Sequence, residues 1–413
     1  MFDAIIVGAR CGGSPTAMLL AKRGYRVLLV DRARFPSDTL STHWIWPTGM
    51  ACLKRWGLLD RLASTNCPPF HTMGLDLGEL RLAGDLPPTD GVAEIYAPRR
   101  MLLDKLLLDA AAEAGAEIRE AFTVTELIYS GESVTGVRGH GQTGTDVSEE
   151  ARIVIGADGR NSLVAKSVGA AEYNVRPSLT CCYYAYWSDV PPHFTAIHMR
   201  PRRTIGSCPA NYGTIASFPT NDGLTITPIV CPRDEFDSAR SDPDRHIRES
   251  LALVDEFADI FSGAKRVEPV RGTGTLPNFF RTPYGNGWAL VGDAGFHKDP
   301  ILAQGISDAF RCAEWLTDAI DAGLSGARPL DDALADYQRI RDERLTPSYN
   351  LTCDLATLGP PPPEMLALYE ALQDDELERN RFFGTLAGTV SIPEYYAPEN
   401  LHRIIGGADR QLA

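Results

Sequence analysis

The first thirty residues constrain the fold of this chain more than any other stretch. Residues 4–7 are a short apolar run rich in β-branched side chains, and apolar residues then recur at helical spacing until Gly24. Residues 26–30 form a second apolar run that ends at Asp31. This order predicts a strand, a glycine turn, a helix and a second buried strand. Such a unit binds the diphosphate of an adenine dinucleotide at the amino end of its helix.

The glycine turn departs from the usual fingerprint at one position. The fingerprint places glycine at its first, third and sixth positions, where this chain has Gly8, Arg10 and Gly13. The missing glycine would let the backbone approach the pyrophosphate. Because Gly12 keeps the turn flexible, we interpret Arg10 as a cationic arm over the phosphates, with a side chain turned to solvent as the alternative.

Asp31 lies about 20 residues beyond the turn, where such units place an acid that accepts the ribose hydroxyl. Cys11 in the turn and Arg32 after the acid are expected to contact the same ligand.

Composition excludes several classes of function. The chain has 413 residues and a formal net charge of −14, so its overall field repels nucleic acid and anionic membrane surfaces. No apolar run is long enough to span a bilayer, and the early first strand leaves no room for a targeting peptide. Scattered cysteines without a Cys-x-x-Cys pair indicate reduced core residues and no metal site. We therefore expect a cytoplasmic protein.

The remaining chain predicts an α/β fold in which a Rossmann-like dinucleotide-binding domain is interleaved with a second domain. We assign residues 1–70, 96–177 and 272–345 to the first domain. Residues 71–95 and 178–271 are expected to form a mostly antiparallel β-sheet substrate domain. Residues 346–413 are expected to be a helical C-terminal segment with helix over 363–384 and turns after it.

Three further motifs lie at predicted element ends. Arg99 and Arg100 open a helix over residues 97–115, where a cation is unfavourable unless it serves an anion. A strand ends in Gly-Ala-Asp-Gly at residues 156–159. Another strand, over 288–291, ends in Gly-Asp and leads through Pro300 to a helix over 301–321.

These motifs in this order resemble the group A flavoprotein monooxygenases of the para-hydroxybenzoate hydroxylase fold, which are related to geranylgeranyl reductases and flavin-dependent halogenases. The similarity covers roughly residues 1–345. It implies FAD as the cofactor, held by the glycine turn and by residues at the later motifs, namely Arg100, Asp158, Gly292, Asp293, Pro300, Gln304 and Gly305.

The resemblance also implies an activity. We expect an enzyme, monomeric or homodimeric, that uses NAD(P)H and molecular oxygen to hydroxylate a small aromatic molecule through a flavin hydroperoxide. His43 and His297 are the candidate catalytic bases, because a histidine titrates in the required pH range. Tyr184 and Tyr186 are expected on one sheet face and Tyr183 on the other.

Two alternatives stay open. One is a flavin-dependent reductase or dehydrogenase similar to the geranylgeranyl reductases, and the other is a non-catalytic binding protein with the flavin fold. The chain lacks the Trp-x-Trp-x-Ile-Pro stretch of the halogenases and the Tyr-x-Trp-x-Phe-Pro stretch of the prenyl reductases, which disfavours both branches.

Overall fold

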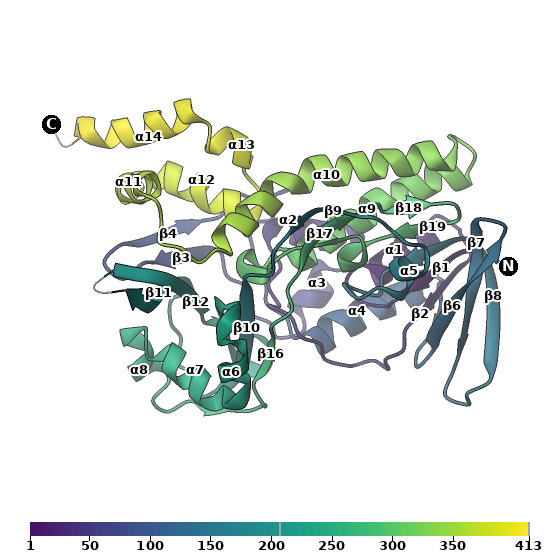
Figure 1. Ribbon diagram of the computed structural model, residues 1–413, viewed down its shortest axis with the longest axis horizontal. Coiled ribbons are helices and arrows are strands. Elements are labelled where there is room, and N and C mark those ends of the chain that lie inside the picture. Colours follow the sequence, from purple (N-terminus) through teal and green to yellow (C-terminus); the bar gives the residue numbers. More distant parts are fainter. Residues whose placement is uncertain (206–207, 412–413) are drawn as a thin grey trace.

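The computed structural model describes residues 1–205 and 208–411, and its first sheet carries the predicted N-terminal unit (Figure 1). The eight strands of this sheet are β1 (Phe2–Val7), β2 (Val27–Val30), β5 (Glu117–Arg119), β6 (Thr123–Ser130), β7 (Ser133–His140), β8 (Asp146–Gly156), β18 (Tyr284–Gly285) and β19 (Trp288–Leu290). β1 pairs in parallel with β2 and β8, and β5 and β19 extend the sheet in parallel. The antiparallel β6/β7 hairpin continues from β8. The predicted strand, turn, helix and strand are confirmed.

Helices cover one face of this sheet. They include α1 (Gly13–Lys22), α2 (Pro47–Trp56), α3 (Leu59–Ala63), α4 (Arg100–Glu113), α9 (Gly305–Leu324) and α10 (Leu330–Leu355), while α5 (Leu163–Ser167) lies against β6 and β8. α1 packs against α4 and α9, and Met18, Leu103 and Phe310 share the buried cluster between them. Because helices cover one face and the β6/β7 hairpin contributes to the core on the other, every residue of β2 is buried.

The second sheet is mostly antiparallel, as predicted. Its nine strands are β3 (Thr72–Asp76), β4 (Arg81–Asp85), β10 (Thr180–Ser188), β11 (Ala196–Ile205), β12 (Cys208–Ala216), β13 (Phe218–Pro219), β14 (Thr225–Pro232), β15 (Lys265–Arg266) and β16 (Arg271–Thr273). The β3/β11 pair is the parallel exception. Three short helices, α6 (Phe236–Ser241), α7 (Pro243–Leu251) and α8 (Asp255–Ile260), lie beside this sheet (Figure 1).

Alternate side chains along β10 belong to two different buried clusters, one on each face of the strand. Tyr183 belongs to the buried cluster under α7 and α8, whereas Tyr184 and Tyr186 belong to the cluster shared with the C-terminal helices. The prediction that Tyr184 and Tyr186 share one face and Tyr183 occupies the other is therefore confirmed.

The C-terminal segment is helical, but it extends further than the sequence predicted. α11 (Pro363–Ala371) and α12 (Glu376–Ala387) are followed by α13 (Ile392–Tyr395) and α14 (Pro398–Gln411), which are yellow in Figure 1. The expectation of turns after residue 384 was wrong, because Tyr395 and Leu401 bury apolar surface in the cluster beside the second sheet.

A third sheet and two short helical turns complete the elements near the predicted site. The sheet contains β9 (Glu172–Arg176), β17 (Asn278–Arg281) and β20 (Phe296–His297), and the turns are η3 (Gly292–Ala294) and η4 (Pro300–Leu302). The helix expected from residue 301 begins at Gly305 instead, because Ala303 has a left-handed backbone (φ 51°) that interrupts it. Among the described residues, no helix is both long enough and apolar enough to cross a membrane.

Candidate active site

One cavity of about 720 Å³ brings most of the predicted site residues together. Its wall includes Gly8, Arg10, Cys11, Gly12, Asp31, Arg32, Arg100, Asp158, Gly292, Asp293, His297, Pro300 and Gly305. These residues come from five separate stretches of the chain. Four of them follow the carboxyl ends of β1, β2, β8 and β19, and the fifth is the start of α4, at Arg100. Gly13, His43 and Gln304 do not line the cavity.

The glycine turn is closed tightly at two positions. Gly8 has a φ of +104°, and a Cβ there would lie 2.4 Å from the Ala157 carbonyl oxygen. A Cβ on Gly13 would lie 1.8 Å from the Gly8 carbonyl oxygen, whereas a Cβ on Gly12 would have ordinary contacts, the nearest at 3.5 Å. The turn therefore requires glycine at Gly8 and Gly13, and it places the amino end of α1 beside the cavity.

A buried carboxylate that the prediction did not include organises the cationic wall. Asp104, on α4, is fully buried and accepts hydrogen bonds from both Arg10 and Arg100, the latter through Nη2 at 2.9 Å and Nε at 3.1 Å. The Cys11 thiol donates to the same carboxylate at 3.5 Å. Arg10 also donates to the Ser37 hydroxyl at 3.0 Å. Two guanidinium groups on one carboxylate leave one positive charge in excess, which suits a diphosphate.

The two predicted acids that follow strands, Asp31 and Asp158, also accept hydrogen bonds from nearby loop residues. Asp31 accepts the backbone N–H groups of Ala9 and Ala33, each at 2.7 Å. Asp158 accepts the Ser162 hydroxyl at 2.5 Å and the Leu163 N–H at 2.6 Å, which places it at the start of α5. Burial raises the pKa of Asp158.

The turn into α9 is supported by buried charges. Asp299 lines the cavity and accepts the Ile301 N–H at 3.0 Å and the Thr180 hydroxyl, and burial raises its pKa to about 6. Lys298 pairs with Asp308 at 3.0 Å and donates to the Gln304 side-chain oxygen. Gln304 therefore stabilises this turn through its contact with Lys298 and does not line the cavity.

The two candidate histidines occupy different environments. His43 is fully buried, with Nδ1 2.8 Å from the Ser41 carbonyl oxygen and Nε2 2.5 Å from the Tyr186 hydroxyl. Burial, followed by the charge of Arg100, lowers the pKa of His43 to about 3, so its ring is neutral near pH 7. His297 lines the cavity, and its Nδ1 contacts the Pro277 carbonyl oxygen.

Because His43 is buried and neutral, we expect the folded protein to lose stability as the pH falls. The unfolded chain takes up a proton below the ordinary pKa of about 6.5, whereas folded His43 takes one up only near pH 3, so stability falls as pH falls through this window. Between pH 7 and pH 5, His43 should account for a loss of about 2 kcal/mol in unfolding free energy. Urea unfolding at pH 7 and pH 5 measures the free energy of unfolding. The difference between the two pH values should be about 2 kcal/mol smaller for His43→Asn than for the wild type.

Asparagine tolerates the left-handed backbone of residue 43 (φ 67°), so the variant avoids added backbone strain. The matched control is His71→Asn at an exposed loop position, which should keep the full pH dependence. Equal pH dependence in wild type and His43→Asn would contradict the buried neutral assignment.

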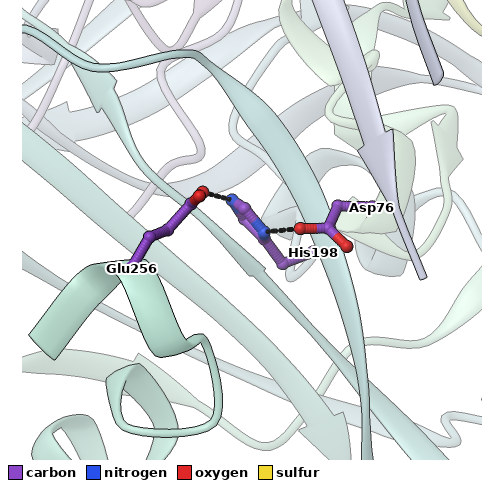
Figure 2. A group of neighbouring side chains, drawn as sticks. All are labelled: Asp76, His198 and Glu256. Atoms are coloured by element: carbon purple, nitrogen blue, oxygen red, sulfur yellow. Dashed lines mark hydrogen bonds and ion pairs between the residues drawn. The ribbon is translucent and has the colours of Figure 1, made fainter. Parts of the chain in front are cut away.

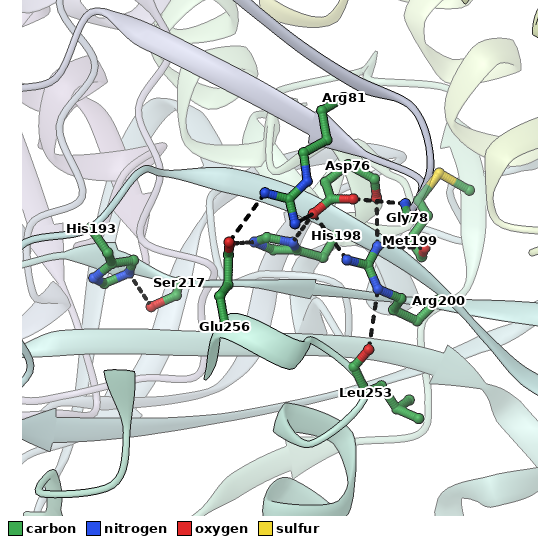
Figure 3. A network of polar contacts seen from close by, with 10 residues as sticks. All are labelled: Asp76, Gly78, Arg81, His193, His198, Met199, Arg200, Ser217, Leu253 and Glu256. Atoms are coloured by element: carbon green, nitrogen blue, oxygen red, sulfur yellow. Dashed lines mark hydrogen bonds and ion pairs between the residues drawn. The ribbon is translucent and has the colours of Figure 1, made fainter. Parts of the chain in front are cut away.

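A second polar cluster lies on the second sheet, outside the cavity wall. Figure 2 shows Asp76 and Glu256 on opposite sides of the buried His198 ring, with Nδ1 2.9 Å from the Asp76 carboxylate and Nε2 3.9 Å from that of Glu256. Figure 3 shows that Arg81 and Arg200 also reach Asp76, at 3.2 and 2.9 Å. Since two guanidinium groups already balance the two carboxylates, this cluster is an ion-pair network between β3, β4, β11 and α8.

The chain is similar in sequence to enzymes of two kinds, a halogenase and a reductase. It is 24% identical to the tryptophan 2-halogenase of Chondromyces crocatus over 81% of this chain and 64% of that protein, so the match spans less than two thirds of the halogenase. It is 28% identical to the digeranylgeranylglycerophospholipid reductase 2 of Methanococcoides burtonii, over 75% of this chain and 72% of the reductase.

Solved structures share the fold at low sequence identity. A flavoprotein/dehydrogenase from Cytophaga hutchinsonii matches with a TM-score of 0.82 and 18% identity over all of both chains. The Pseudomonas aeruginosa protein described as "pqsL, a probable FAD-dependent monooxygenase" matches with a TM-score of 0.70 and 21% identity over 93% of this chain and 98% of that one. Residues 1–346 match the family described as "FAD binding domain". The chain thus belongs to this FAD-binding family of flavin-dependent oxidoreductases.

Proposed function

We propose that this chain is an NAD(P)H- and oxygen-dependent monooxygenase that uses FAD to hydroxylate a small aromatic molecule. The observation that carries the proposal is the composition of the cavity. Its wall includes the glycine turn and Arg10 from the first sheet, and it also includes Tyr184 from β10 of the second sheet together with Leu276 and Phe296. One cavity therefore offers a polar cradle for a dinucleotide and an apolar, aromatic wall for a substrate.

The residues of the cradle fit FAD. The tight Gly8 and Gly13 positions, the amino end of α1 and the Arg10/Arg100 pair suit its diphosphate, while Asp31 suits a ribose hydroxyl. When bound, FAD supplies the hydride and oxygen chemistry that side chains lack. We assign Gly292, Asp293, Pro300 and Gly305, which line the same cavity, to the remainder of the cofactor.

The protein's own contribution is to position the substrate, exclude water and move a proton. Leu40, Leu276 and Phe296 form apolar wall that excludes water from the reacting centre. We assign proton transfer to His297 because it lines the cavity. Its Nδ1 donates to the Pro277 carbonyl, which leaves Nε2 as the proton acceptor. Both ring nitrogens of His43 already have partners, so we assign it to orienting Tyr186.

The monooxygenase proposal is tested with the purified protein. We expect a flavin spectrum, NAD(P)H oxidation stimulated by a small aromatic compound, and one atom of labelled dioxygen in the product. Turnover without oxygen incorporation would favour the second candidate, a flavin-dependent reductase, which the similarity to the Methanococcoides burtonii reductase supports. Bound FAD that NAD(P)H does not reduce would instead favour a binding protein.

The role of Arg10 is tested by its dependence on salt. Arg10→Ala should bind FAD more weakly by about 1 to 3 kcal/mol, because a charged hydrogen-bond donor beside the diphosphate is lost. The loss should be larger at low ionic strength, where screening is least. FAD titrations of both apoproteins at low and high salt measure it.

Arg26→Ala is the matched control for Arg10→Ala. The Arg26 guanidinium lies over the Phe2 ring, 4.5 Å from its centroid, and does not line the cavity, so FAD affinity should stay at the wild-type value. Equal dissociation constants for wild type and Arg10→Ala at both salt concentrations would leave Arg10 as a structural partner of Asp104 and Ser37.

A further inference from the structure

Two thiols face each other across the β10/β14 strand pair. Cys181 and Cys231 are directly opposed in the antiparallel register, both are fully buried, and their sulfur atoms are 3.2 Å apart. Directly opposed residues in antiparallel strands have Cα atoms about 4.5 to 5.5 Å apart. This separation lies within the range that a disulfide bond spans, about 4.4 to 6.8 Å. The backbone therefore holds the two cysteines at a Cα separation that a disulfide bond can span, while their sulfur atoms, 3.2 Å apart, are not bonded.

A histidine lies beside one of the two thiols. His246, on α7, has its Nε2 atom 3.6 Å from the Cys231 sulfur, and its ring packs against Tyr183 with centroids 5.0 Å apart. The hydrogen bond with Cys181 and burial raise the pKa of Cys231, whereas His246 lowers it. The pair is thus a stable dithiol at rest, and the imidazole is the group positioned to accept a thiol proton.

The pair is separate from the cavity. Cys181 belongs to the buried cluster that β10 and β14 share with α7 and α8, while the next residue, Cys182, lines the cavity on the opposite face of the strand. The nine-residue helix α7 packs against β10 beside the pair, so a small oxidant would reach the buried thiols only through local opening of this helix.

We propose that Cys181 and Cys231 form a redox-active dithiol that hydrogen peroxide converts to a disulfide. His246 accepts the Cys231 proton, and the thiolate attacks peroxide, so that an S–O bond forms and the O–O bond breaks. The departing hydroxide takes the proton back from His246 and leaves as water. The Cys181 sulfur then displaces the hydroxyl group, which forms the S–S bond and releases a second water. The two thiols lose two electrons and two protons in total, and one peroxide becomes two waters.

The bond would cross-link two neighbouring strands of the second sheet. It closes a loop with a sequence separation of 50 that contains β11 and β12, and it lies three residues from the cavity residue Tyr184 on β10. The oxidised protein should therefore have a higher thermal midpoint than the reduced protein, because the cross-link constrains the unfolded chain.

The test is peptide mapping of the wild-type protein. The purified protein is treated with hydrogen peroxide, remaining thiols are alkylated, and a non-reduced digest is analysed by tandem mass spectrometry. We expect a Cys181–Cys231 linked peptide that is lighter than its two parts by two hydrogen atoms and that a reductant separates. Recovery of both residues as alkylated thiols or as sulfonic acids would overturn the proposal.

Four variants sharpen the test. Cys182→Ser, the matched control on the same strand, should keep the link, whereas Cys181→Ser and Cys231→Ser should each abolish it. His246→Gln should form the same link about a hundredfold more slowly, because the proton acceptor is lost. An unchanged oxidation rate in His246→Gln would overturn the role of the histidine, and a link that persists in Cys181→Ser would overturn the pairing.

Discussion

The Gly13→Ala variant is expected to be recovered without FAD, because the glycine turn has no room for even one methyl group. The added Cβ would lie 1.8 Å from the Gly8 carbonyl oxygen and 3.1 Å from the Ala157 side chain. The closest atom belongs to the backbone, so the turn itself would have to open. Overpacking costs about 1 to 3 kcal/mol, and we expect the upper end here because the clash is with backbone. Since this cost falls on the turn that would bind the cofactor, FAD affinity should be about a hundredfold lower. FAD titration and the flavin content after purification measure the effect.

Gly263→Ala is the matched control for this substitution. A Cβ at Gly263 would meet no atom within 4 Å, and the residue is exposed and far along the chain from the glycine turn. This variant should bind FAD as the wild type does. A Gly13→Ala protein with a full complement of flavin and the wild-type dissociation constant would show that the turn can open at little cost.

The Asp104→Asn variant is expected to lower the free energy of unfolding by about 3 to 5 kcal/mol, because it breaks a buried ion pair while keeping the shape of the side chain. Asp104 is fully buried and is the carboxylate that both Arg10 and Arg100 contact. The Arg100 side chain is only 10% exposed, so its charge would be left without compensation from solvent. Urea unfolding of the wild-type and variant proteins in the same flavin state measures the difference.

The same helix supplies the control for Asp104→Asn. Asp109 pairs with Lys105 at the same i,i+4 spacing on α4, but both side chains are about 40% exposed. Because solvent screens this pair, Asp109→Asn should change stability by less than about 1 kcal/mol. Equal effects of the two substitutions would show that Asp104 does not carry the electrostatic role inferred from its burial.

The Gly13→Ala and Asp104→Asn substitutions act on the same part of the cavity. Gly13 shapes the turn at the amino end of α1, and Asp104 fixes the two arginines from the side of α4. The two residues are 91 positions apart in the sequence, and α1 packs directly on α4. The cradle for the diphosphate is thus a joint product of a tight turn and a buried ion-pair network.

The local features of the site followed from the sequence alone. The glycine turn, the strand that ends at Asp31 and the Gly292-Asp293 motif depend on short-range rules: which residues allow a tight turn, and which apolar spacing gives a strand or a helix. Thirteen of the sixteen predicted site residues line one cavity, although several of them, Arg100 and Pro300 among them, were predicted from the family resemblance and not from these rules. Alternation along β10 likewise predicted which tyrosines share a face.

The partners of individual side chains were decided only by the tertiary structure. The sequence suggested His43 as a candidate base. In the fold its ring contacts Tyr186, which is 143 positions away in the sequence, and the ring is buried and neutral. Arg10 meets Asp104 across 94 residues, and α14 forms where turns were expected because it buries Leu401. These outcomes depend on which faces of distant elements pack together. Burial and charge pairing are properties of that packing, so they set protonation and orientation in ways that no local spacing of residues encodes.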